Sequence, residues 1–126
     1  MKAEDLMIGD WITIRPLNVK TKVAAIKELE NGVYVATRNV PEYLLFNKEN
    51  FEPIPLTPEI LEKNGFNCKF SIYAIGVTNM NEPLYWSQRK LLIDIGVRAR
   101  YICKCIFVHE LQHALKLCGI EKEIVL

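Results

Sequence analysis

The chain has 126 residues, of which half are apolar and a quarter charged, and its formal net charge is +1. This length suits one ordinary domain or two very small modules, and the composition excludes an intrinsically disordered chain. A net charge near zero gives no electrostatic basis for a partner, although residues 1–62 carry −3 and residues 63–126 carry +4. A modest basic surface is therefore expected on the second half.

The chain is expected to work in the cytoplasm, away from membranes. Its opening, MKAEDLMIGDW, lacks the apolar core of a signal peptide. No apolar run approaches the roughly 20 residues that span a bilayer. Without a secretion signal, the four cysteines are interpreted as reduced thiols: Cys68, Cys103, Cys105 and Cys118.

The first half has the pattern of a small antiparallel barrel. Alternation predicts a strand over residues 11–15, and the Asn31-Gly32 pair predicts a hairpin within residues 21–37, because both residues tolerate the positive φ of a type I′ turn. Further short strands are predicted over 42–46 and 50–56. Roughly five strands in this length favour an SH3-like barrel over residues 1–56.

A connecting helix is predicted over residues 57–65. Thr57 is a good N-cap, Pro58 suits the first helical position, and Asn64-Gly65 suits the C-terminal stop. The side chains that this helix is expected to bury are Ile60 and Leu61.

Residues 66–126 are predicted to form a small antiparallel sheet closed by a helix. Strands are expected over 68–77, 84–97 and 98–107, with a polar turn over 78–83 and a helix from Phe107 to Cys118. Residues 120–126 alternate and suggest one terminal strand. The chain is therefore predicted to be α+β, with 1–56, 57–65 and 66–126 packed as one unit.

The C-terminal helix contains His109-Glu110-Leu111-Gln112-His113, the H-E-x-x-H spelling of many zinc peptidases. In such a site the two histidines bind Zn²⁺ and the glutamate activates a water. The helical wheel, however, places both histidines opposite the apolar stripe, on the expected solvated face. A zinc-dependent hydrolase and two exposed histidines on an amphipathic helix both stay open, and the second is favoured.

A third zinc ligand would have to come from elsewhere in the chain. Only thirteen residues follow His113, and the upstream candidate is Cys68, at a distance comparable to that in peptide deformylases. Its surroundings, GFNCKF, lack the glycine-rich loop and the EGC context of that family. The sequence therefore predicts no bound metal, with a zinc site as the alternative.

Two further patterns lie in the predicted sheet. Cys103 and Cys105 share one face of a strand and are interpreted as small core residues, since a lone C-x-C is a weak metal signal. The other face predicts a basic ribbon, interrupted by Asp94, that could bind nucleic acid beside Tyr85 or Trp86. Its members are Arg89, Lys90, Arg98, Arg100 and Lys104. An ordinary solvated strand face is the alternative interpretation.

Three segments, AEDLMIGDW, PIPLTPEILEKNGF and FVHELQHALKLCGIEKEI, resemble a family of small proteins from Bacteroidetes genomes and their mobile elements. That family shows DLRIGN/DW, PIPLTEEWLLKFGF and VHQLQNL at these places, and no activity is established for it. In its closing motif the position of Glu110 is often Gln and that of His113 often Asn. The resemblance therefore implies that the zinc spelling is accidental.

The sequence as a whole favours a non-catalytic binding or adaptor module, and the resemblance implies an origin in a mobile element. Its partner is expected to be a protein or a nucleic acid. The alternative is a zinc-dependent hydrolase that uses His109, Glu110 and His113.

Overall fold

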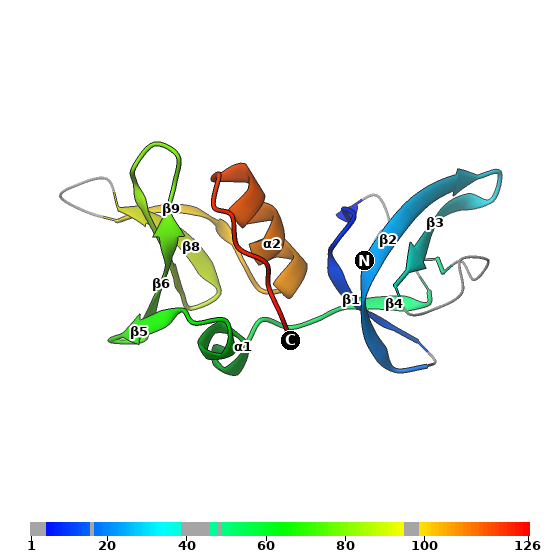
Figure 1. Ribbon diagram of the computed structural model, residues 1–126, viewed down its shortest axis with the longest axis horizontal. Helices are drawn as coiled ribbons and strands as arrows, with labels where there is room; N and C mark the ends of the chain where they lie inside the picture. The colour runs from blue at the N-terminus through cyan, green and yellow to red at the C-terminus, as the bar shows by residue number, and fades with distance from the viewer. Residues whose placement is uncertain (1–4, 16, 39–45, 48, 95–98) are drawn as a thin grey trace. The chain divides into compact units, whose positions relative to one another are not determined.

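The structure, a computed structural model, describes residues 5–15, 17–38, 46–47, 49–94 and 99–126. Within these residues the fold is α+β, with two antiparallel sheets and two helices (Figure 1). The chain divides into two compact units, unit 1 (Met1–Ile54) and unit 2 (Pro55–Leu126). The division falls two residues before the predicted boundary at residue 56, so the connecting helix belongs to unit 2.

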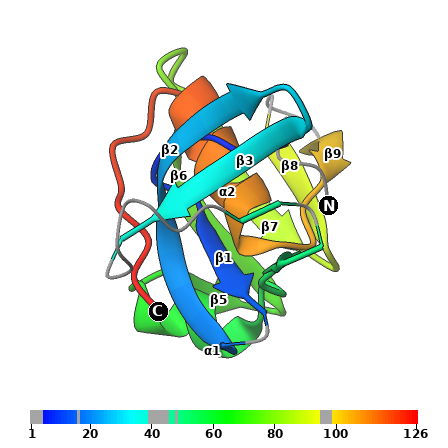
Figure 2. The same ribbon diagram turned by 90° about the vertical axis from the view of Figure 1, so that its right-hand side faces the viewer.

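Unit 1 contains four strands in the order β3-β2-β1-β4. Figure 2 shows β1, β2 and β3 side by side. Burial alternates along β1 as expected for a strand with one face on a core. The two isoleucines are buried, while Trp11 and Thr13 on the other face are half-buried. The strands are β1 (Trp11–Ile14), β2 (Val19–Leu29), β3 (Gly32–Thr37) and β4 (Phe51–Pro53).

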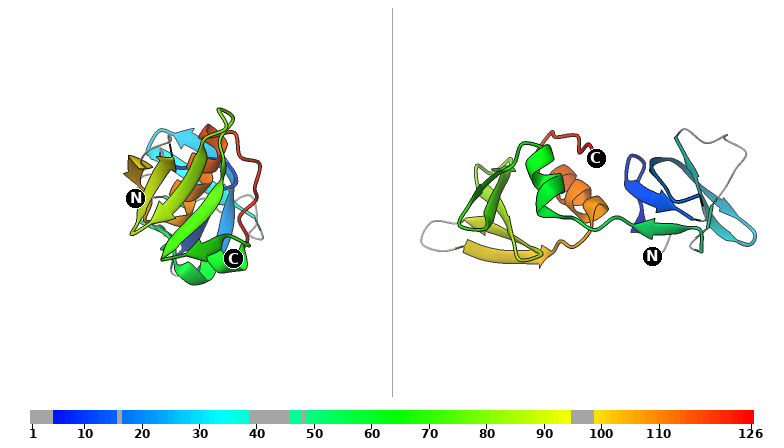
Figure 3. Two further views of the ribbon diagram at one scale, coloured as in Figure 1. Left: turned by 90° about the vertical axis from the view of Figure 1, so that its left-hand side faces the viewer. Right: turned by 90° about the horizontal axis from the view of Figure 1, so that it is seen from below.

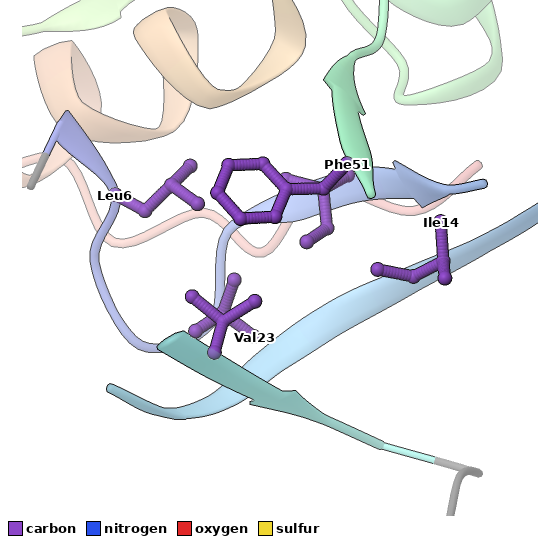
Figure 4. Close-up of a cluster of buried hydrophobic side chains, with 6 residues drawn as sticks. Leu6, Ile14, Val23 and Phe51 are labelled. Atoms are coloured by element: carbon purple, nitrogen blue, oxygen red, sulfur yellow. The ribbon is translucent and has the colours of Figure 1, made fainter. Parts of the chain in front are cut away.

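The core of unit 1 gathers apolar side chains from every strand and from the segment before β1. Figure 4 shows Leu6, Ile14, Val23 and Phe51 in this cluster. Burying each such side chain contributes about 1.5–3 kcal/mol relative to leaving it exposed. The full cluster is Leu6, Ile12, Ile14, Val23, Val35 and Phe51.

Several details of unit 1 differ from the prediction. The β2–β3 hairpin is confirmed, but Leu29 pairs with Gly32, so the two-residue turn is Glu30-Asn31, one residue earlier than predicted. Gly32 has φ +135° and follows the turn. The predicted strand over 42–46 lies outside the described residues except Phe46, whose backbone bridges Val35. The four-stranded ladder is not closed, and an SH3-like barrel stays a prediction.

Unit 2 is a five-stranded meander in the order β5-β6-β7-β8-β9, with α2 against one face. Figure 3 shows the sheet in front of α2 in its left view and the same layers from below in its right view. No helix among the described residues is long and apolar enough to cross a membrane. The elements are α1 (Pro58–Lys63), β5 (Asn67–Lys69), β6 (Ile72–Val77), β7 (Pro83–Ser87), β8 (Lys90–Asp94), β9 (Ala99–Lys104) and α2 (Val108–Leu117).

Two tight turns divide strands that the sequence predicted as continuous. Lys69 pairs with Ile72 across the Phe70-Ser71 turn, and Ser87 pairs with Lys90 across Gln88-Arg89. All four turn residues have φ between 50° and 63°, as a type I′ turn requires, although none is glycine. The predictions of single strands over 68–77 and 84–97 are therefore wrong.

Helix α1 forms as predicted and ties down the end of the chain. Thr57 Oγ1 accepts a hydrogen bond from the Ile60 amide as N-cap, and Leu61 is fully buried while Ile60 is only half-buried. At the other end, the buried Asn64 side chain donates to the Val125 carbonyl and accepts from the Val125 amide, both at 2.8 Å.

Residues 120–126 therefore do not form the predicted terminal strand. They run outside the ladder, held by Asn64 and by the buried side chain of Ile124. An amide side chain can satisfy one residue of an extended chain as a neighbouring strand would. This anchor replaces strand pairing at the end of the chain.

Replacing Asn64 by Ala is expected to lower the free energy of unfolding by about 1–3 kcal/mol, because the amide and the carbonyl of Val125 lose the side chain that pairs with both. Asn67→Ala is the matched control, since Asn67 is exposed on β5 and its replacement should change stability by no more than about 0.5 kcal/mol. Urea unfolding followed by circular dichroism measures both. Equal effects would contradict the anchoring role of Asn64.

Candidate functional site

The segment before α2, residues 105–107, is held by hydrogen bonds on each of its backbone groups. The Cys105 amide donates to the Arg89 carbonyl, and the Cys105 carbonyl accepts from the indole Nε1 of Trp86 at 2.9 Å. The Ile106 carbonyl accepts from the Leu56 amide, and the Phe107 carbonyl accepts from amides in the first turn of α2. The start of the H-E-x-x-H helix is thus fixed to the sheet and to the segment before α1.

Glu110 caps this helix. Its Oε1 accepts from the Phe107 amide at 2.9 Å and from the Ile106 amide at 3.0 Å. These amides precede the first turn and have no partner within the helix, and a glutamate at this position is the acceptor of a capping box. A carboxylate oxygen engaged by two backbone amides is occupied with holding the helix and not with activating a water.

The two histidines lie together on α2, but not on the predicted solvated face. Their ring centroids are 5.6 Å apart with the planes at 77°. His109 is buried, with 7% of its surface exposed, and stacks on the Phe107 ring at 5.9 Å. The prediction of two exposed histidines is wrong for His109, which is buried against a residue that precedes the helix, and His113 is half-buried.

The described residues do not complete a metal site around this pair. Cys68, the candidate third ligand of the alternative zinc site, is exposed on β5. Among residues 5–15, 17–38, 46–47, 49–94 and 99–126, no three or more His, Cys, Asp or Glu side chains form a group that could hold a metal ion. Two histidines alone fall short of the three protein ligands of catalytic zinc sites.

The remaining thiols occupy different surroundings. Cys105 is fully buried as predicted, and burial, then the nearby Glu110 and Cys103, raises its pKa to about 12. Cys103 is exposed, so its assignment to the core is wrong, although partial burial still raises its pKa. Partial burial also raises the pKa of Cys118. A thiol with a raised pKa is a poor nucleophile near neutral pH.

The predicted basic ribbon is divided between two faces of the sheet. A β-bulge shifts the β8–β9 register, so that Lys90 pairs with Lys104 whereas Ile93 pairs with Arg100. Directly opposed residues point to the same face. Arg100 therefore lies on the face of Ile93, and Lys104 lies on the other face with Lys90.

Arg98 lies outside the described residues. Arg89 is exposed in the turn between β7 and β8. The single basic ribbon on one strand face is thus wrong for Arg100, because simple alternation along the strand could not account for the bulge.

The two aromatic residues predicted beside the ribbon, Tyr85 and Trp86, lie on opposite faces of the sheet. Trp86 is buried and bound to the Cys105 carbonyl, so it cannot stack on a base. Tyr85 pairs with Leu92, which in turn pairs with Tyr101, and these three side chains share the face of Lys90 and Lys104. Lys90 Nζ lies 5.9 Å from the centroid of the Tyr101 ring, which confirms their common face. Tyr101 was absent from the predicted site.

A pocket in unit 2 was also missed. It has a volume of about 590 Å³ and lies between the end of α1, strands β6 and β7, and residues 120–122. Gly76 stands at its wall, where β6 bulges and a Cβ would meet the Ile120 side chain at 3.1 Å. A glycine inside the pattern SIYAIGV is the sequence signal for such a bulge and close approach.

The structure thus brings some predicted site residues together and separates others. His109 and His113 meet on α2, and Lys90 and Lys104 meet on one sheet face. Within the described part of the chain Cys68 joins no group that could hold a metal ion, and Arg100 lies on the opposite face from the lysines. A comparison of the chain with protein-family models, with curated proteins and with solved structures finds no match.

Changing Glu110 separates its capping role from a catalytic one. Glu110→Ala is expected to lower the free energy of unfolding by about 1 kcal/mol, because two amides lose their acceptor. Glu110→Gln keeps a carbonyl acceptor and should stay within about 0.5 kcal/mol of the original chain. Chemical denaturation measures both, with the exposed Glu121→Ala as control. Unchanged stability in Glu110→Ala would contradict the capping role.

Proposed function

We propose that this protein is a non-catalytic binding or adaptor module that acts in the cytoplasm on a protein or nucleic-acid partner. The observation that carries the proposal is the position of Glu110, whose Oε1 accepts two backbone amides at the start of α2. The one candidate catalytic base is then part of the fold. The exposed sheet face of unit 2, with its lysines and tyrosines, offers a surface for a partner.

We also propose that the chain belongs to the Bacteroidetes and mobile-element family that it resembles. The structural roles of the shared segments support this. In the opening segment Leu6 is in the core, and in the central one Thr57 and Asn64 cap α1. In the closing one Val108 and Leu111 are fully buried. Motifs with such architectural roles do not require an enzymatic function.

We also propose that unit 1 is a small SH3-like β-barrel. Its sheet order is β3-β2-β1-β4, and the Phe46 backbone exchanges two hydrogen bonds with Val35 on the edge strand β3. The chain leading into β4 therefore reaches back toward the opposite edge strand. Small barrels of this type commonly hold extended peptides in aromatic grooves.

The alternative function is a zinc-dependent hydrolase. The proximity of His109 and His113, with ring centroids 5.6 Å apart, is the observation in its favour. For this chemistry Glu110 would have to leave the two amides that it accepts and turn toward a metal-bound water. That movement would remove the cap from α2, which is why the adaptor is preferred.

Elemental analysis of zinc distinguishes the two functions, on protein purified without a histidine tag or chelating resin. The adaptor predicts far less than one zinc per chain, and no change on His113→Ala beyond background. About one tightly held zinc per chain that is lost in His113→Ala would overturn the proposal, because a two-histidine site requires both ligands. Circular dichroism of the variant confirms that it is folded.

A further inference from the structure

We propose that the outer face of the unit 2 sheet binds single-stranded nucleic acid, an inference that rests on the non-catalytic function proposed above. The outer face is the side of β7, β8 and β9 that carries Tyr85, Ser87, Lys90, Leu92, Tyr101 and Lys104. All of these residues lie within the described part of the chain.

Two rows of side chains cross this face. The register places Tyr85, Leu92 and Tyr101 directly opposite one another, and Ser87, Lys90 and Lys104 form the next row. From the strand spacing, the two tyrosines are about 10 Å apart, and the lysine row lies about 7 Å farther along the strands. A row of aromatic rings therefore runs beside a row of cations.

The lysine row is electrostatically unfavourable by itself. Lys90 and Lys104 are exposed and directly opposed, and like charges in this position repel. Arg89 is exposed in the turn that leads into Lys90. The acidic residue of β8, Asp94, lies on the same face but at the other end of the strand, opposite Ala99 and about 7 Å beyond the aromatic row. A phosphate bound between the lysines would relieve this repulsion.

The aromatic row suits bases. Tyr101 is 51% exposed and Tyr85 half-buried, so ring surface is accessible while the backbone is held in the sheet. Bases of any sequence stack on such rings, and cations beside them bind the phosphates of a single strand. Protein interfaces are depleted in lysine, so two opposed lysines favour a nucleic acid over an acidic protein.

Fluorescence anisotropy with a labelled oligothymidine tests the surface in the full chain. Binding is expected to weaken with salt, with a slope of log K against log salt of about −2, since three cations contribute about 0.7 each on a single strand. Duplex DNA of matched length is expected to bind more weakly, because its bases are stacked on each other and cannot reach the tyrosines.

Variants on the two faces of β9 make the test specific. Lys104→Ala should reduce the salt slope by about 0.7, and Tyr101→Ala should weaken binding by about tenfold. Arg100→Ala is the matched control, because it removes a cation from the same strand but from the opposite face. It should leave the salt slope unchanged. Circular dichroism shows that each variant keeps its fold.

Several results would overturn the inference. These are no binding by the original chain, an effect of Arg100→Ala equal to that of Lys104→Ala, and no effect of Tyr101→Ala. Equally tight binding of a labelled poly-glutamate would instead indicate an acidic protein partner. Any of them, together with an absence of zinc, would leave the adaptor function standing and remove only the nucleic-acid partner.

Discussion

The structure of unit 2 depends on the three residues that lead into α2. Cys105, Ile106 and Phe107 make their backbone hydrogen bonds with the sheet, with the segment before α1 and with α2 itself. A backbone group withdrawn from water without a partner costs about as much as a lost hydrogen bond, so displacing this segment would break several hydrogen bonds at once. Two side chains contribute to these hydrogen bonds: Trp86 of the sheet donates to the segment, and Glu110 of the helix accepts from it. Glu110 of the H-E-x-x-H sequence is therefore used to hold the start of the helix in place.

The hydrogen bonds of this segment also explain why some features could be predicted from the sequence and the role of Glu110 could not. Local signals succeeded where one residue has one role: Thr57 and Pro58 begin α1. The class of fold and the final helix could also be predicted from periodicity. Glu110 carried two signals at once, because a glutamate three residues after the N-cap marks a capping box as well as a peptidase motif. Only the positions of the Ile106 and Phe107 amides decide between them.

The errors in the sheet have a different cause. Phe70-Ser71 and Gln88-Arg89 adopt turn conformations that glycine and asparagine favour, so their positive φ values come from the pairing of the flanking strands. The bulge in β9 likewise depends on its partner strand, and it moved Arg100 away from Lys104. Strand registers are properties of pairs of strands, whereas a sequence pattern describes one strand at a time. For that reason the sequence could not predict that Tyr85, Leu92 and Tyr101 form one row across the sheet.

Hydrogen exchange at the Ile106 and Phe107 amides tests most directly whether Glu110 belongs to the fold. If Glu110 accepts both amides in solution, they exchange as slowly as amides in the middle of α2, through global unfolding, and added zinc does not change their rates. Rapid exchange of both amides while the helix stays protected, or loss of their protection on adding zinc, would show that the carboxylate is free for chemistry. That result would contradict the account.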